Sequence, residues 1–91
     1  MNTAITQLLG IQHPLILTGM SWISTPELVA AVSNAGGLGI LALGPLSPEQ
    51  TRAAILRVRE LTDRPFGVNC ALLMPGAKET AEVALELHVP V

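Results

Sequence analysis

The stretch STPELVAAVSNAGGLGILAL, residues 24–43, contains a helix followed directly by a strand. Its first four residues, STPE, offer hydroxyls that can cap a helix, a proline suited to the first turn and a carboxylate that complements the helix dipole. Gly36-Gly37 can close this helix, because glycine readily adopts the left-handed conformation of helix ends. Residues 38–43 are then apolar without a break, which predicts a strand covered on both faces.

The same unit recurs on either side of this stretch. SPEQ, residues 47–50, has the spacing of a capping box and starts a second helix, which DRP at residues 63–65 ends. A third helix follows Pro75-Gly76. Strands that alternate with helices in this way are typical of a parallel α/β sheet. The predicted strands are residues 15–17, 38–43 and 66–70, and the start of a fourth at 89–91.

Helical spacing also predicts which residues of each helix are buried. Residues 5–9, before the first strand, are either one helical turn or a lid packed on the sheet. The predicted apolar faces are Leu28, Val29, Val32 and Ala35 in the first long helix, Ala54, Ile55, Val58 and Leu61 in the second, and Ala77, Ala81, Ala84, Leu85 and His88 in the third.

A parallel sheet of three strands would leave one face and both edges bare, and the last residue falls inside a predicted strand. We therefore expect an α/β fold that is the N-terminal part, about three βα units, of a (β/α)8 TIM barrel of about 250 residues. Residues 1–91 would be one segment of a single barrel domain.

Composition excludes several classes of protein. Of the 91 residues, 49% are hydrophobic and 13% charged, with a net charge of -2, so there is no basic surface for nucleic acid. The longest apolar run is far shorter than the roughly 18–20 residues that span a bilayer. A single cysteine, Cys70, excludes a disulfide framework and a thiolate zinc site. With no secretory signal at its start, the chain is expected in the cytoplasm.

Ligands of parallel α/β folds bind beyond the carboxyl ends of the strands, here the loops at residues 18–24, 42–47 and 69–76. Asn69 is a polar residue in an apolar run, and a buried amide without partners costs about 1–3 kcal/mol. Contact with a ligand is therefore favoured over a purely structural role. Gly19 would let the backbone approach a flat ligand closely.

Other candidate residues carry less chemistry. Trp22 either lines a pocket at the same edge or packs against the fold. His13 and His88 precede strands and therefore lie at the opposite edge, and neither has a carboxylate or nucleophile at a useful spacing. No cationic residue near Cys70 would activate its thiol. The sequence thus predicts no catalytic residue and no metal site within this chain.

Several motifs, in this order and spacing, resemble the nitronate monooxygenase family, formerly called 2-nitropropane dioxygenases. They are ITQLLGI at residues 5–11, Gly19-Met20, SNAGGLG at 33–39 and TDRPFGVN at 62–69. The resemblance runs from about Ile5 to Leu73, and it extends to the FMN-dependent enoyl-acyl-carrier-protein reductases, whose N-terminal segments are similar.

This resemblance implies an FMN-dependent TIM-barrel enzyme that oxidises alkyl nitronates with O2 to a carbonyl compound and nitrite. Gly19 and Met20 would lie against the flavin ring through backbone groups, and Asn69 would hydrogen-bond the cofactor. The chain departs from the family at Leu17-Thr18, where Gln and a small residue are common, so the polarity near the flavin differs. The family's catalytic histidine lies further along the barrel, so the 91 residues alone are expected to be inactive.

Three functions remain open at this point. The first is a nitronate monooxygenase, with a small nitronate and O2 as its substrates. The second is an FMN-dependent enoyl-acyl-carrier-protein reductase. The third is a non-catalytic fragment or assembly module whose open sheet edge pairs with another chain, either the remaining barrel segment or a second copy.

Overall fold

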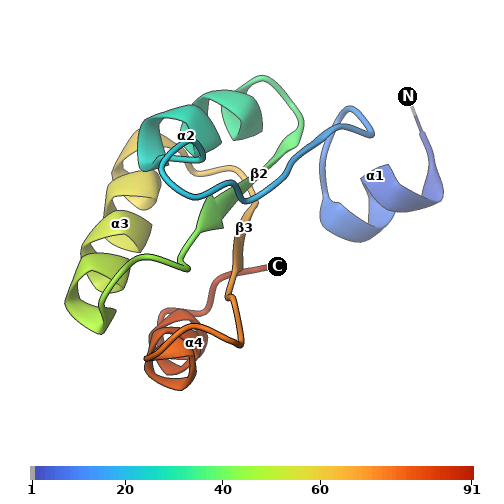
Figure 1. The fold of residues 1–91 in the computed structure, drawn as a ribbon. Coiled ribbons are helices and arrows are strands. Elements are labelled where there is room, and N and C mark those ends of the chain that lie inside the picture. Colours follow the sequence, from blue (N-terminus) through green and yellow to red (C-terminus); the bar gives the residue numbers. More distant parts are fainter. Residues whose placement is uncertain (1) are drawn as a thin grey trace.

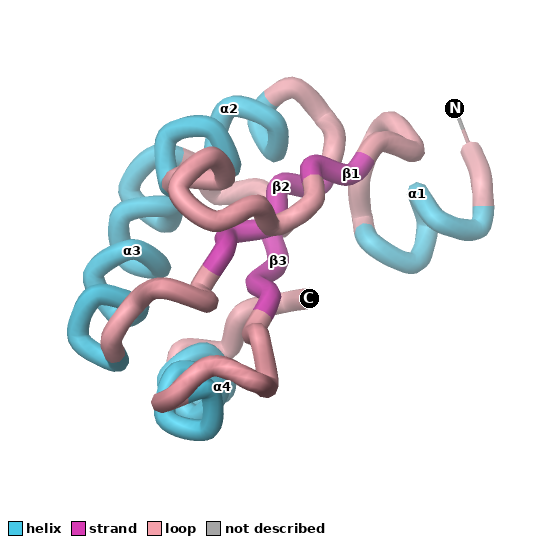
Figure 2. Tube along the Cα trace, in the orientation of Figure 1, coloured by secondary structure: helices cyan, strands magenta, loops and turns pink. Residues whose placement is uncertain are grey.

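In the computed structural model, which describes residues 2–91, the strands form one parallel sheet in the order β1-β2-β3. Helices precede and separate the strands in the predicted alternation, and Figure 2 shows the strands running through the middle of the molecule. The strands are β1 (Ile16–Leu17), β2 (Leu38–Ala42) and β3 (Phe66–Asn69), and the helices are α1 (Ala4–Leu9), α2 (Pro26–Asn34), α3 (Pro48–Leu61) and α4 (Ala77–Glu86).

The predicted helix ends are confirmed. Thr25 caps α2, with its hydroxyl accepting from the Leu28 N–H at 3.5 Å, and Ser47 and Gln50 form the capping box of α3. Gly36 follows α2 with a φ of 102°, a left-handed conformation that a side chain would strain. Local sequence therefore determines where these helices begin and end.

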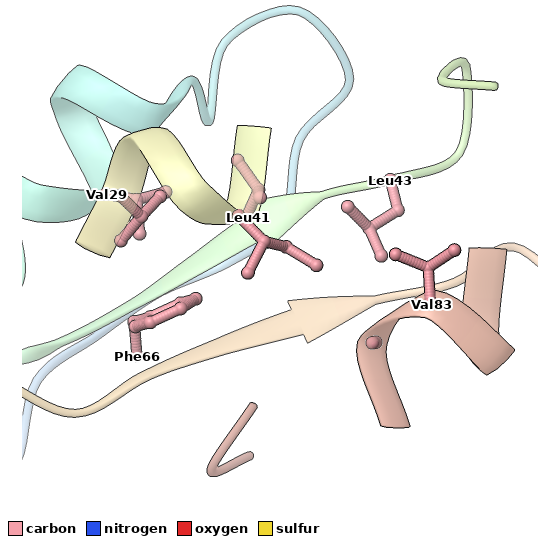
Figure 3. Close-up of a cluster of buried hydrophobic side chains, with 8 residues drawn as sticks. Val29, Leu41, Leu43, Phe66 and Val83 are labelled. Atoms are coloured by element: carbon pink, nitrogen blue, oxygen red, sulfur yellow. The ribbon is translucent and has the colours of Figure 1, made fainter. Parts of the chain in front are cut away.

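The hydrophobic core lies between the sheet and the helices. Figure 3 shows Val29 of α2 near Leu41 and Phe66 of the strands, and Leu43 near Val83 of α4. Helix α2 packs closely on β2, because a Cβ placed on Gly39 would meet the Val29 carbonyl oxygen at only 2.3 Å. In Figure 1, α2 and α3 lie side by side on one side of the sheet and α1 stands apart on the other.

As expected for three strands alone, part of the sheet, at β1, is left bare within residues 2–91. Leu15 and Ile16 are 66% and 46% exposed, whereas Leu38 and Leu41 of the central strand are each 1% exposed. The difference arises because helix α2 packs against β2 and extends to β3, whereas the contacts of β1 are mainly with β2. Apolar surface on β1 is thus left uncovered within residues 2–91.

The predicted helix faces are correct only in part. Ile55 and Val58 of α3 are buried as expected, but Leu28 of α2 is exposed and Leu85 of α4 is 76% exposed. A period of 3.6 residues fixes the spacing of a buried face but leaves the choice between adjacent arcs to packing. The buried residues of α2 are Val29, Ala30 and Ser33, those of α3 are Thr51, Ile55 and Val58, and those of α4 are Thr80, Val83 and Ala84.

The predicted fourth strand is not formed. The Val68 N–H donates to the Val91 carbonyl at 3.1 Å, so the end of the chain lies along the free edge of β3 without building a ladder. Residues 5–9, expected to be either one helical turn or a lid packed on the sheet, are helical and belong to α1. None of the helices described in residues 2–91 has the length and apolarity needed to cross a bilayer.

Candidate functional site

Three loops come together at the carboxyl ends of the strands. A Cβ placed on Gly44, after β2, would lie 3.7 Å from the Ala71 Cβ, after β3, and 3.8 Å from the Ser21 Oγ, after β1. The loops at residues 18–24, 42–47 and 69–76 contain no Asp, Glu, Lys or Arg. A ligand at this edge would therefore be held by backbone groups, the Asn69 amide and apolar contacts.

Gly19 and Asn69, which are 50 residues apart in the sequence, meet at this edge. The Asn69 side-chain amide donates from Nδ2 to the Gly19 carbonyl oxygen at 3.4 Å. A Cβ on Gly19 would lie 2.4 Å from Asn69 Oδ1, so only glycine leaves room for this amide. The two residues singled out from the sequence are thus brought into contact.

The environment of Asn69 differs from the expectation in one respect. The residue is exposed rather than buried, because β3 ends there and the side chain reaches the open edge. The contact with Gly19 uses an N–H of the Asn69 amide, and no hydrogen bond to Oδ1 is found within residues 2–91, so Oδ1 can accept from a ligand. The Gly19 N–H has no hydrogen-bond partner within residues 2–91 and is available as a donor.

Ser24 is the residue at this edge that sequence reasoning missed. It is 3% exposed, and its hydroxyl donates to the Thr18 carbonyl oxygen at 2.6 Å while accepting from the Met20 N–H at 2.9 Å. Two adjacent hydroxyls stand before α2, and Thr25 alone serves as the cap. Because a helix has one N-cap position, one of the two hydroxyls had to have another role, and this could have pointed to Ser24.

These bonds also define what Met20 can offer. Its N–H is used by Ser24, and its carbonyl oxygen accepts from the N–H groups of Ile23 and Ser24 at 3.0 and 2.8 Å. The backbone of Met20 is therefore engaged within the loop. Its side chain, 40% exposed, is the part that remains free for a ligand.

Trp22 lies near the middle of the same loop. It has a φ of 64°, and its side chain is 74% exposed. It lines a cavity of about 170 Å³ together with Ala42, Pro45 and Leu46 from the end of β2 and the following loop. Of the two alternatives for Trp22, the structure favours lining a pocket.

Neither His13 nor Cys70 takes part in the Gly19–Asn69 contact. His13 is exposed and lines an open hollow with Gly10 and Gln12, and Cys70 packs in part against the core. No cluster of three or more His, Cys, Asp or Glu side chains that could hold a metal occurs within the described residues. Within residues 2–91 the ion pairs lie on helix surfaces, where Arg57 binds Glu60 and Glu27.

The model of the nitronate monooxygenase family matches residues 2–89. The chain belongs to this family. Within the nitronate monooxygenase family, a nitronate monooxygenase of Pseudomonas aeruginosa is 51% identical over 81 residues, which cover 89% of this chain and 23% of that protein.

Two further relatives carry other names. A (3aS,4S,5R,7aS)-5-hydroxy-7a-methyl-1-oxo-octahydro-1H-indene-4-carboxyl-CoA dehydrogenase of Rhodococcus jostii is 51% identical over 69 residues, 76% of this chain and 20% of that protein. The structure of FabK from Thermotoga maritima superposes with a TM-score of 0.97 at 48% identity, over 99% of this chain and 29% of that one. The chain thus spans between a fifth and a third of the length of these relatives.

Proposed function

We propose that this chain is the FMN-binding first part of a (β/α)8-barrel oxidoreductase that oxidises alkyl nitronates with O2 to a carbonyl compound and nitrite. The observation that carries the proposal is the contact of Gly19 with Asn69 at the carboxyl edge of the parallel sheet. Membership of the nitronate monooxygenase family supports the redox class. The whole domain, of which residues 1–91 are the N-terminal segment, would carry the activity.

The residues at this edge suit a flat, uncharged ring system. The Gly19 N–H is a free donor within residues 2–91, Asn69 Oδ1 is a free acceptor, and the Met20 side chain supplies an apolar contact. FMN supplies the electron transfer when it is bound. The three residues would hold and orient its ring. Because this edge lacks cationic side chains, the phosphate would bind at the usual barrel site after strands seven and eight.

The barrel architecture is supported by the open edges of the sheet. Val91 already bonds to the free edge of β3, and Leu85 of α4 is exposed beside it. The cavity between them is lined by apolar side chains including Val68, Ala81 and Val89. We propose that the remaining barrel segment, or a second copy of the chain, covers this surface, and that the protein works in the cytoplasm, where a single free cysteine is stable.

A second candidate function is that of an FMN-dependent enoyl-acyl-carrier-protein reductase. It is favoured by the similarity to FabK, which extends over 99% of this chain. The carboxyl-CoA dehydrogenase of Rhodococcus jostii also takes a thioester by its name. This function requires reduction of the flavin by a nicotinamide cofactor, which the first does not.

A hybrid protein tests both functions. The 91 residues replace the matching segment of the Pseudomonas aeruginosa nitronate monooxygenase, to which they are 51% identical. We expect a yellow protein that binds FMN, consumes O2 with propyl nitronate and releases nitrite. Rapid flavin reduction by NADH or NADPH with turnover of an enoyl thioester would favour the second function instead.

The control hybrid carries Asn69→Ala, which removes the free acceptor at the cofactor edge. It should fold with the same far-UV circular dichroism and bind FMN at least about tenfold more weakly, as expected for a lost hydrogen bond in a ligand site. A folded, colourless parent hybrid would contradict the FMN assignment. That result would leave the third hypothesis, a non-catalytic assembly module, as the function of the chain.

A further inference from the structure

Trp22 occupies a backbone conformation that bulky residues rarely adopt. Its φ of 64° lies in the left-handed region, where a side chain beyond Cβ is disfavoured. The conformation is imposed by the loop, because Ser24 binds Thr18 and Met20 on either side of the turn. Within residues 2–91 this unfavourable geometry gains little burial, since the side chain is 74% exposed.

The covered part of the indole faces a definite cavity. The cavity measures about 170 Å³ and lies between the start of α2, the end of β2 and the start of α3. Its wall includes Trp22, Pro26, Ala42, Pro45 and Leu46, and the residues that line it include no charged side chain. A buried apolar cavity of about 150 Å³ in another protein binds benzene, so this volume suits an apolar group of up to about six carbons.

The cavity adjoins the loop of the proposed cofactor site, because Ser24 lines it and also accepts a hydrogen bond from the Met20 N–H. Trp22 and Ser24, which line it, belong to the same loop as Gly19 and Met20, and Ala42 is the register partner of Asn69 in the sheet. Its lining is mostly apolar, with Ser24, Thr25 and Gln50 as the polar residues, and carries no charge, so the cavity complements a hydrocarbon group and disfavours a charged one. A ligand whose reactive end lies at the cofactor edge can therefore place its apolar end here.

We propose that Trp22 and this cavity bind the alkyl substituent of the substrate, so that Trp22 is a specificity-determining residue. The inference rests on the proposed function, because it requires a substrate beside the Gly19–Asn69 site. Affinity should rise with alkyl length by up to about fourfold per methylene, the gain expected from burying each CH2 group, until the cavity is full at about six carbons.

The test uses the FMN-loaded hybrid and its Trp22→Gly and Trp22→Phe variants. Dissociation constants for ethyl and hexyl nitronate are obtained under anaerobic conditions from the concentration dependence of the rate at which each nitronate reduces the flavin. The parent should prefer the hexyl ligand by at least about tenfold. Trp22→Gly should lose most of this preference with little change for the ethyl ligand, and Trp22→Phe should retain most of it.

The stability of the Trp22→Gly variant distinguishes a role of Trp22 in ligand binding from a role in packing the fold. Glycine accepts the left-handed backbone, so Trp22→Gly should leave the urea unfolding midpoint of the 91-residue chain unchanged or higher. A lower midpoint, or equal weakening of both nitronates, would overturn the assignment of Trp22. Failure of the parent hybrid to bind FMN would instead overturn the proposed function, and the two failures are thereby distinguished.

Discussion

Close contacts leave no room for a side chain at Gly39 or at Gly19, but the two glycines lie in different regions and contact different kinds of atoms. At Gly39, in the packed layer, an added Cβ would meet the backbone oxygen of Val29 at 2.3 Å. At Gly19, on the open edge, it would meet the side chain of Asn69 at 2.4 Å. The first contact joins two elements of the core, and the second places a polar side chain for a ligand.

The difference indicates how the two regions use the same residue. Backbone atoms of a helix cannot move without shifting the helix, so the space at Gly39 is essential to the fold. The amide of Asn69 is exposed and can rotate away, so the space at Gly19 matters for the position of that amide. A substitution in the first region should affect stability, and one in the second should affect binding.

Gly39→Ala is expected to have the largest effect on stability. Because α2 must move away from β2, the free energy of unfolding should fall by about 3 kcal/mol or more, as in overpacked cores. Urea unfolding followed by far-UV circular dichroism measures it. Gly44→Ala is the matched control, since its new Cβ would have ordinary contacts at 3.7 and 3.8 Å and should change stability by less than about 0.5 kcal/mol. Equal effects of the two substitutions would refute the contact at Gly39.

Gly19→Ala should leave the fold intact and weaken FMN binding in the hybrid by at least about tenfold, because Asn69 must leave its place. Fluorescence titration with FMN gives the dissociation constant. Gly44→Ala, at the same edge, should bind FMN as the parent does. An alanine at residue 19 that preserves the affinity would remove the Gly19–Asn69 contact from the cofactor site.

Thr51→Val tests the packed core of the comparison between the core and the open edge. Thr51 is fully buried, and within residues 2–91 its hydroxyl has no hydrogen-bond partner. An apolar group of the same shape should raise the free energy of unfolding by about 1 kcal/mol. The control is Thr80→Val. The Thr80 hydroxyl donates to the Ala77 carbonyl oxygen at 2.9 Å, so its removal should not raise the free energy of unfolding. Equal shifts of the urea midpoint in both variants would contradict this explanation.

Arg57→Gln should have the smallest effect. Hydrogen bonds to Glu60 and then to Glu27 raise the pKa of the Arg57 guanidinium above its ordinary value, and all three side chains are exposed. A raised pKa contributes stability below the unfolded-state pKa, and this stability is lost only as the pH rises through the folded-state value, well beyond the range of pH 7 to 10. The midpoint difference between the variant and the parent should therefore not change between pH 7 and 10, and added salt should reduce it. A change in that difference between pH 7 and 10 would point to another titrating group.

The order of the elements and their ends follow from the sequence. Thr25 and Ser47 cap their helices, Gly36 closes one, and each effect acts over a few residues. For the same reason Gly19 and Asn69 could be singled out from loops at strand ends. Such local rules need no knowledge of the packed chain.

Tertiary structure decided what depends on distant neighbours. Leu85 has the spacing of a buried residue yet is exposed, because packing selected the arc of α4 that bears Val83. Asn69 proved to be exposed and to face Gly19 across 50 residues of sequence. Ser24 has a hydroxyl that could equally have capped a helix, and only the folded loop directs it to Thr18 and Met20. Side-chain partners far apart in sequence are set by the whole arrangement of elements, which a local pattern does not contain.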